Sequence, residues 1–240
     1  QNHRLSPKPK LPAPGLSKID GLAFYRDGAI IKTKERALID DLDSLPFINH
    51  ERYFRDNPAR HVGCIITSRG CPFNCSFCCL ESVSRRKVRL RSAKNVVDEI
   101  EGMARNIPQM NKIWIHDDTF FIDNQRVIDI CDEIIRRGIK KEFIASGRVK
   151  PLSRQVVEKL EQAGFRKILL GLESGNEKIL KACHKGITLK DVEEALKFFV
   201  GVNIAVTMFL IVGLPGETRA TIKDTAKFVK KLQRIKYINY

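Results

Sequence analysis

The regular alternation of short apolar stretches with helical segments from Val62 onward restricts the fold more than any other feature. Apolar stretches predict strands over residues 62–67, 112–116, 142–146, 167–171 and 204–212. Helices with apolar residues at helical spacing follow them, and four have a capping residue at their start, namely Ser92, Asn124, Ser153 and Thr188. Such βα alternation implies a parallel sheet with helices outside it, and right-handed crossovers curl that sheet into a full or partial barrel.

We therefore predict an α/β fold, a partial parallel (β/α)6 barrel of TIM type over residues 61–240. A last helix over residues 220–233 leads to the start of a sixth strand at Tyr237, so we expect the barrel to be truncated near strand six. Residues 1–60 are expected to form a linker and tether. Four prolines indicate an extended linker over residues 1–19, and Asp-Gly between two apolar runs predicts a hairpin at about 21–33. Residues 36–60 show little regular structure.

Charge and cysteine content narrow the classes of function. The formal net charge of +15 suits nucleic acid or anionic partners, although a solvated basic surface explains it more simply. No stretch approaches the ~20 apolar residues that span a bilayer. Seven cysteines, three of them within eight residues, fit a reducing cytoplasm and a metal site better than a disulfide framework. Because the chain begins with Gln1 and ends in an apolar pattern, we expect it to be a piece of a longer protein.

Three cysteines on one predicted loop indicate an iron–sulfur site. Cys71, Cys75 and Cys78 follow the first strand with the spacing C-x3-C-x2-C. Thiolates are the ligands that iron–sulfur clusters use, and three of them hold three irons of a cubane while the fourth iron stays open. A structural zinc site needs a fourth ligand, and neither His61 nor Cys79 has finger-like spacing.

This segment, with Phe77 directly before the third cysteine, resembles the signature of the radical S-adenosylmethionine (SAM) superfamily. The resemblance implies a 4Fe–4S cluster on Cys71, Cys75 and Cys78, whose open iron is chelated by the amino and carboxylate groups of SAM. It also implies one-electron cleavage of SAM to methionine and a 5′-deoxyadenosyl radical, with an electron donor such as flavodoxin or ferredoxin. The radical abstracts hydrogen from a substrate that the sequence does not identify, and Phe77 is expected near the adenine.

Further SAM contacts are predicted where the strands end, since barrel chemistry gathers there: Asp117, Asp118, Arg148, Glu173, Ser174 and Gly213. Arg148 is suited to bind a carboxylate through two hydrogen bonds. Asp117-Asp118 departs from the usual Gly-Gly-Glu of the family, and a helix cap explains it equally well. An acid at a strand end, such as Glu173, also fits a purely structural role. Cys183-His184 invites a metal interpretation, but no partner lies nearby in the sequence.

Several features resemble the cobalamin-binding branch of the superfamily, namely the proline-rich linker, the hairpin, residues 41–47 and residues 117–120. The branch implies methyl transfer or ring formation, with cobalamin held by an N-terminal domain whose D-x-H-x-x-G motif does not occur here. A methylthiotransferase acting on tRNA or protein is the competing enzyme. The positive charge favours it, whereas the lack of cysteine in residues 1–60 opposes it. A metal-bearing nucleic-acid-binding module is the non-enzyme alternative, and the motifs after strands two to five oppose it.

Overall fold

The computed structural model describes residues 15–57 and 59–234. The chain forms two compact units, residues 1–40 and 41–240. The described part of the first unit begins with a single 3-10 turn, η1 (Leu16–Lys18), and continues into a hairpin. Among the described residues, no helix is both long and apolar enough to cross a membrane.

The hairpin of the first unit is the one that the Asp-Gly pair predicts. It joins β1 (Ala23–Arg26) to β2 (Ala29–Lys32) in antiparallel register, with Arg26 opposite Ala29. The loop is therefore just Asp27 and Gly28, and both have positive φ, 49° and 83°. A two-residue loop with positive φ at both positions matches the twist of the flanking strands. The predicted hairpin is confirmed.

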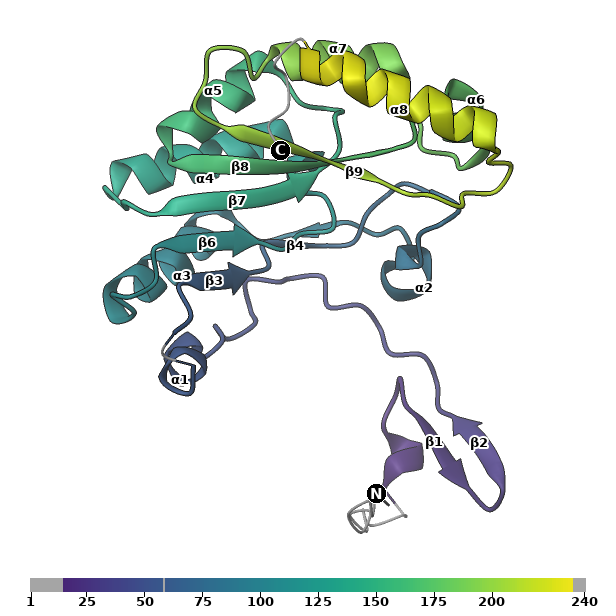
Figure 1. Ribbon diagram of the computed structural model, residues 1–240. Coiled ribbons are helices and arrows are strands. Elements are labelled where there is room, and N and C mark those ends of the chain that lie inside the picture. The colour runs from purple at the N-terminus through teal and green to yellow at the C-terminus, as the bar shows by residue number, and fades with distance from the viewer. Residues whose placement is uncertain (1–14, 58, 235–240) are drawn as a thin grey trace, which may run out of the picture. The chain divides into compact units, whose positions relative to one another are not determined.

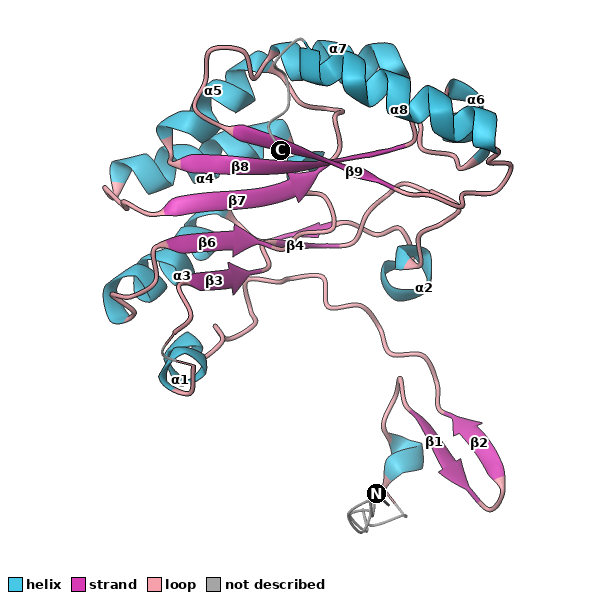
Figure 2. Cartoon of the chain, in the orientation of Figure 1, coloured by secondary structure: helices cyan, strands magenta, loops and turns pink. Residues whose placement is uncertain are grey.

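A five-stranded parallel sheet forms the centre of the second unit, in the order β3-β6-β7-β8-β9 (Figures 1 and 2). Each step along the chain adds one parallel strand at the same side of the sheet, which is how TIM-type barrels are built. The predicted partial barrel is thereby confirmed, while the start of strand six at Tyr237 lies outside the described residues. The strand bounds are β3 Val62–Ile65, β6 Lys112–Ile115, β7 Glu142–Gly147, β8 Phe165–Glu173 and β9 Ala205–Leu210.

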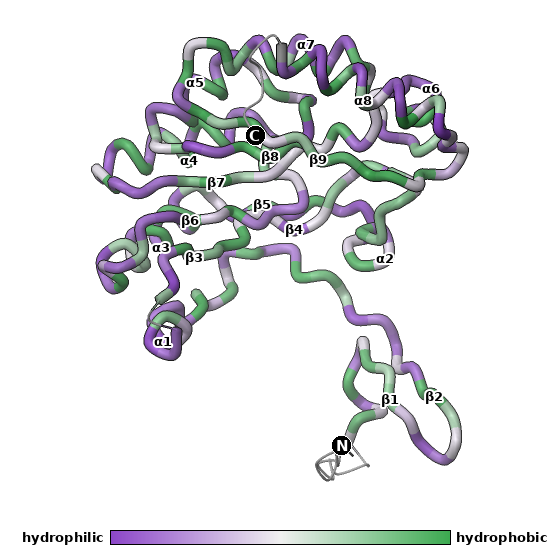
Figure 3. The backbone as a smooth tube through the Cα atoms, in the orientation of Figure 1, coloured by the Kyte–Doolittle hydropathy of each residue, from purple (hydrophilic) through white to green (hydrophobic). Residues whose placement is uncertain are grey.

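Amphipathic helices connect these strands, and Figure 3 shows hydrophobic and hydrophilic residues alternating around them. Ser92, Ser153 and Thr188 cap their helices as predicted, each accepting a hydrogen bond from the amide three residues on. The first three long helices pack side by side along the sheet (Figure 1). The longer helices are α3 Ala93–Asn106, α4 Asn124–Arg136, α5 Arg154–Gln162, α7 Leu189–Lys197 and α8 Arg219–Arg234.

The core lies between the sheet and these helices. Strand β8 is buried along almost its whole length, as expected of a central parallel strand covered on both faces. Phe143 and Phe165 pack with ring centroids 5.2 Å apart, and Phe120 lies 5.9 Å from Phe165. Burying each such side chain contributes about 1.5–3 kcal/mol. Cys131 belongs to this core, and its burial raises the pKa of its thiol.

Several short elements were not predicted, because they are too short to show a period in the sequence. One of them, α1, lies in the expected tether, where the side chain of Asn49 accepts a hydrogen bond from the amide of Arg52. Another, the ribbon of β4 and β5, pairs Ser68 with Leu90 just after the first strand of the sheet. The short elements are α1 His50–Arg55, β4 Ser68–Arg69, α2 Leu80–Ser84, β5 Arg89–Leu90, η2 Phe120–Ile122 and α6 Glu177–Ala182.

The prediction that Asn124 caps α4 is wrong by one residue. Asp123 is the cap, and its Oδ1 accepts a hydrogen bond from the amide of Arg126 at 3.0 Å. The side chain of Asn124 instead donates to the carbonyl of Pro151 at 2.5 Å. Both residue types are good caps. The tertiary contact of Asn124, which no local pattern contains, decides between them.

Candidate functional site

The three cysteines of the C-x3-C-x2-C motif lie on the loop between β4 and α2 (Figure 1). Cys71 and Cys75 are half-buried, and Cys78 is exposed. Inside the loop the amide of Cys78 donates to the carbonyl of Cys75 at 3.0 Å, and the amide of Ser76 donates to the carbonyl of Cys183 at 3.0 Å. The loop is therefore held to the segment that follows α6, while its thiols stay accessible.

The Cys71 thiol interacts electrostatically with the other two thiols of the loop. Burial raises the pKa of the Cys71 thiol, and the charges of Cys75 and Cys78 add to that rise, while the backbone at Phe73 and the charge of Arg148 oppose it. The sulfur of Cys71 therefore lies near enough to those of Cys75 and Cys78 for their charges to act on it. Three soft thiolates in such a group are the donor set of an iron–sulfur cluster, so the residues present fit one.

The spacing of the side chains differs from that of a single-ion site. Within residues 15–57 and 59–234, no three His, Cys, Asp or Glu side chains converge as ligands of one metal ion. A cubane does not require such convergence, because each of its thiolates binds a different iron atom. The loop fits a cluster by the chemistry of its three thiols.

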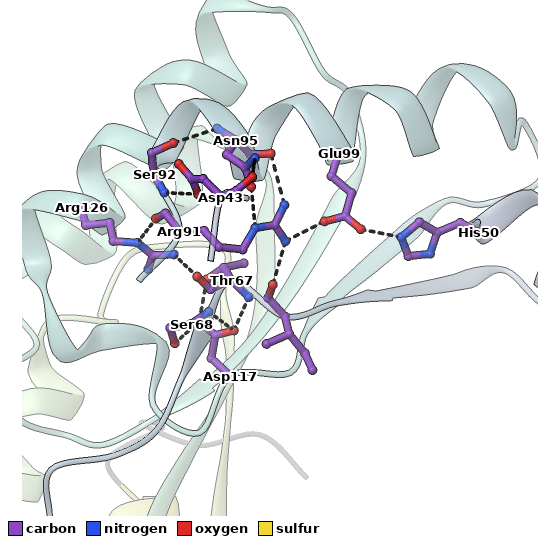
Figure 4. Close-up of polar contacts among 11 residues, drawn as sticks. Asp43, His50, Thr67, Ser68, Arg91, Ser92, Asn95, Glu99, Asp117 and Arg126 are labelled. Carbon is purple, nitrogen blue, oxygen red and sulfur yellow. Dashed lines mark hydrogen bonds and ion pairs between the residues drawn. The ribbon is translucent and has the colours of Figure 1, made fainter. Parts of the chain in front are cut away.

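Two aspartates after β6 hold the residues that lead into this loop. The buried carboxylate of Asp117 accepts four hydrogen bonds of 2.5–3.1 Å from the amides and hydroxyls of Thr67 and Ser68 (Figure 4). Asp118 Oδ2 accepts from the amide of Gly70 at 2.8 Å. Gly70 has φ of 94°, and a Cβ there would overlap the carbonyl of Lys87. The SAM contacts predicted for the two aspartates stay predictions. The hydrogen-bond partners observed for both carboxylates lie in residues 67–70, directly before Cys71.

We call the hydrogen bonds of Asp117 and Asp118 to residues 67–70 the clamp. A wider polar network around Arg91 adjoins it (Figure 4). Arg126 donates to the carbonyls of Thr67 and Arg91 at 2.6 and 2.8 Å. Arg91 donates to the carbonyl of Ile66 and to Glu99, whose other oxygen lies 2.8 Å from His50 Nε2. The network therefore connects α1, α3 and α4 to the residues that follow β3.

Burial alone disfavours the charged form of Glu99, but the hydrogen bonds from His50 and Arg91 outweigh burial and lower the pKa of this carboxyl. The hydrogen bonds of His50 and Arg91 together thus favour the ionised form of this buried acid. Because Arg91 also binds the carbonyl of Ile66, the charge of Glu99 helps to fix the backbone just before the cysteine loop.

Arg148, at the end of β7, touches the cysteine loop directly. Its Nη1 lies 3.4 Å from Cys75 Sγ, and its guanidinium carbon lies 3.9 Å from the ring centroid of Phe73. Its Nη2 donates to the carbonyl of Lys185, and its buried Nε has no hydrogen-bond partner among the described residues. Arg148 therefore places a positive charge directly beside the sulfur of Cys75.

Glu173, at the end of β8, forms a buried ion pair with Lys185. Its Oε1 lies 2.7 Å from Lys185 Nζ, and the two residues are 7% and 4% exposed. The same Nζ lies 5.9 Å from the ring centroid of Phe77, which is 37% exposed. Phe77 and Glu173, predicted separately from two motifs, are thus brought together by a lysine that the sequence did not single out.

The last two predicted residues have partners of their own. Ser174 is fully buried, and its hydroxyl lies 3.3 Å from that of Thr225 on α8. The amide of Gly213 donates to Glu217 Oε2 at 2.5 Å, which closes the turn after β9. Neither is shown in contact with the cysteine loop, so their predicted role in SAM binding stays a prediction.

Sequence reasoning missed the importance of the segment after α6. Cys183 is buried, its thiol donates to the carbonyl of Leu180 at 3.4 Å, and burial chiefly raises its pKa. The charge of Cys75 adds to that rise, so this thiol lies near the loop. Gly186 directly after Lys185, in a stretch between two helices, was the one available signal that this stretch turns sharply.

Comparison with known proteins gives a consistent result. A model of the radical SAM superfamily matches residues 65–229. An uncharacterized methyltransferase of Pyrococcus horikoshii is 31% identical over 222 residues, covering 90% of this chain and 48% of that protein. The anaerobic magnesium-protoporphyrin IX monomethyl ester cyclase of Cereibacter sphaeroides is 31% identical over 216 residues, covering 87% and 35%.

A solved structure supports the same fold. The radical SAM methyltransferase TsrM of Kitasatospora setae, with tryptophan and a SAM analogue bound, matches with a TM-score of 0.76 at 19% identity. That match covers 91% of this chain and 45% of TsrM. Another structure of TsrM holds cobalamin and a 4Fe–4S cluster. The chain spans less than half the length of these three relatives.

Proposed function

The chain belongs to the radical SAM superfamily, and on that premise we propose that it binds a 4Fe–4S cluster through Cys71, Cys75 and Cys78 and cleaves SAM reductively. The observation that carries the proposal is the loop itself. It carries three thiols at the spacing C-x3-C-x2-C, and the guanidinium of Arg148 lies 3.4 Å from one sulfur. A bound cluster supplies the electron that splits SAM into methionine and a 5′-deoxyadenosyl radical.

The protein's own residues would prepare this chemistry in three ways. Asp117 and Asp118 hold the approach to the loop in one conformation. Arg148 places positive charge beside Cys75 and ties that part of the loop to the carbonyl of Lys185. Phe77, partly exposed, offers a flat apolar surface on which an adenine ring can stack.

We further propose that the substrate reaction is methyl transfer linked to cobalamin, or ring formation. The support is that one relative of 31% identity is named as a methyltransferase and another as a cyclase. Cobalamin would be bound outside residues 1–240, because the D-x-H-x-x-G motif does not occur in them.

The test is anaerobic reconstitution followed by chemical analysis. We expect about four irons per chain and, with a reductant and SAM, 5′-deoxyadenosine detected by chromatography. Cys71→Ala, Cys75→Ala and Cys78→Ala should each lose deoxyadenosine formation. Cys79→Ala is the matched control, because this exposed cysteine neighbours the motif without belonging to it. One tightly bound zinc with no SAM cleavage would instead favour a metal-bearing binding module.

A further inference from the structure

A hollow beside α6 adjoins the cysteine loop from the outside. It measures about 750 Å³ and is lined mainly by residues of α6 and of the turn that follows this helix. Asn74, which lies between Cys71 and Cys75 in the sequence, also lines it. Figure 1 shows α6 beyond the arrowheads of the parallel strands, at the end of the sheet where α2 also lies. The hollow is therefore a part of the surface from which the loop can be approached.

A single guanidinium group lies between the wall of this hollow and the sulfur of Cys75. Gly186 lines the hollow, and a Cβ at this position would lie 3.7 Å from Arg148 Nη2. The other terminal nitrogen of Arg148, Nη1, lies 3.4 Å from Cys75 Sγ. The amide of Ser76 also donates to the carbonyl of Cys183 at 3.0 Å, which holds the loop against the same segment. A molecule seated in the hollow would thus lie close to a ligand of the proposed cluster.

Two lysines of α6 place positive charge on the rim of the hollow. Lys178 and Lys181 are both exposed and line it together with the exposed His184. Because they are three residues apart, the two lysines lie on the same face of the helix. The ion pairs among the described residues include neither of them, so both charges are available to a partner.

The acidic side chains of the same rim already have partners. Asp191 pairs with Lys150 at 2.8 Å, and Glu177 Oε1 accepts from the first backbone amide of α7 at 2.7 Å. Between the charged groups, Leu180 and Ile187 contribute apolar surface to the hollow. Apolar surface surrounded by a polar rim is the usual anatomy of a surface that binds another protein.

The proposed reaction indicates what kind of protein would bind here. Reductive cleavage of SAM takes one electron, which a separate donor supplies to the cluster. Electrons pass between two proteins only when their redox centres come close, so the donor must dock beside the cysteine loop. Encounters of this kind bury little surface, and a small hollow suits them. A positive rim favours an acidic donor and speeds its approach to a chain whose formal net charge is +15.

We propose that this hollow is the docking site of an acidic electron-transfer protein, whose surface carboxylates bind Lys178 and Lys181. The inference rests on the proposed function, which creates the need for the electron. One electron leaves the reduced redox centre of the donor and enters the oxidised cluster, and no bond forms or breaks. Arg148 lies between the docking site and Cys75.

The test is the affinity of the reconstituted chain for an acidic bacterial flavodoxin, measured by anaerobic titration calorimetry. An ionic strength of about 0.1 M largely screens charges more than about 10 Å apart, so local contacts dominate. Lys178→Glu/Lys181→Glu should raise the dissociation constant at least about tenfold, because two attractions become repulsions.

Arg105→Glu/Lys140→Glu is the matched control, since it changes the net charge by the same amount. Both residues are exposed and lie shortly before β6 and β7, at the opposite end of the sheet from the cysteine loop. This variant should bind flavodoxin within about twofold of the unsubstituted chain, because its charges are screened from the docking site.

Cluster reduction, followed by absorbance after rapid mixing, tests whether the docked donor delivers its electron. With reduced flavodoxin, the rate constant should fall at least about tenfold in Lys178→Glu/Lys181→Glu and change little in the control. With the radical cation of methyl viologen, a small reductant that needs no docking site, all three proteins should be reduced at similar rates. Their iron contents should also be equal.

Normal flavodoxin affinity in Lys178→Glu/Lys181→Glu, or an equal loss in the control, would overturn the inference. Normal flavodoxin affinity with lost binding of transfer RNA would assign the hollow to nucleic acid instead. A chain that methyl viologen reduces and flavodoxin does not would overturn the inference as well. By contrast, a chain that binds no iron, or one whose reduced cluster does not cleave SAM, would overturn the proposed function itself.

Discussion

Removing the carboxylate of Asp117 tests whether the cysteine loop depends on the clamp at its base. In Asp117→Ala the amides of Thr67 and Ser68 lose their acceptor in a buried place, as do the two hydroxyls. A hydroxyl can rotate toward another partner, but an amide cannot. Each buried amide left unpaired costs about 1–3 kcal/mol, so we expect a loss of about 2–6 kcal/mol in the free energy of unfolding.

The loss should be large compared with the whole stability of a domain, which is about 5–15 kcal/mol. Asp117→Asn should lose less, because its remaining oxygen can still serve both amides while the stronger bonds to an ionised group are gone. The assay is urea unfolding of the iron-free chain under reducing conditions. Asp129→Ala is the control, since Asp129 is an exposed acid on α4 whose side chain binds only Gln125 among the described residues.

Asp117 should also affect how much metal the chain binds. If Asp117 holds the approach to Cys71, its loss should lower the iron bound per chain after reconstitution even when no thiol is changed. Asp117→Ala that unfolds within about 0.5 kcal/mol of the Asp129→Ala control, the usual range of surface substitutions, would refute the reasoning. Full iron content in Asp117→Ala would refute the expected effect of Asp117 on iron binding.

Two further predictions concern the same region. Gly70→Ala should unfold at a lower urea concentration and bind less iron, because a Cβ would overlap the carbonyl of Lys87. Gly138→Ala is the control, since Gly138 also has a positive φ, 64°, but open space around it, and it should lose less stability. Equal losses of stability in the two variants would contradict this prediction. Because its folded pKa is lowered, Glu99 should contribute stability that is complete above its unfolded pKa of about 4.3 and is lost as the pH falls through the folded value. Urea unfolding from pH 6 to pH 3 should therefore show a smaller decline for Glu99→Gln than for the unsubstituted chain, and equal declines would disprove the contribution.

The parallel sheet could be predicted because its signals are local. A strand such as β6 shows as an apolar run, and the cap at Ser92 is written in a few neighbouring residues. The predictions that were wrong depended on contacts between residues far apart in the sequence. The side chain of Asn124 binds the carbonyl of Pro151 and does not cap α4. Strand β3 ends at Ile65, before the predicted end at Thr67, because Thr67 and Ser68 bind Asp117. No pattern within a dozen residues contains those partners.

The site divides in the same way. The cysteine motif is a local spacing, and it led directly to the loop. Lys185 had no such signal, since its partner Glu173 lies on another element and its burial follows from a turn after α6. The predicted role of Asp117 came from its place after a strand, and that place is real. What the sequence does not contain is whether a side chain there faces a ligand or the neighbouring strand.

Polar residues at the ends of these strands hold the cysteine loop in place through hydrogen bonds. The cysteine loop is largely exposed, so it buries little apolar surface and cannot be held by the hydrophobic effect. Hydrogen bonds must then fix it, and they come from the strand ends: Asp117 and Asp118 at its start, Arg148 at Cys75. A loop fixed in this way loses less conformational entropy when it binds a cluster, and that saving strengthens the binding. Polar residues at the ends of the barrel strands thus serve the site even where they do not touch the ligand.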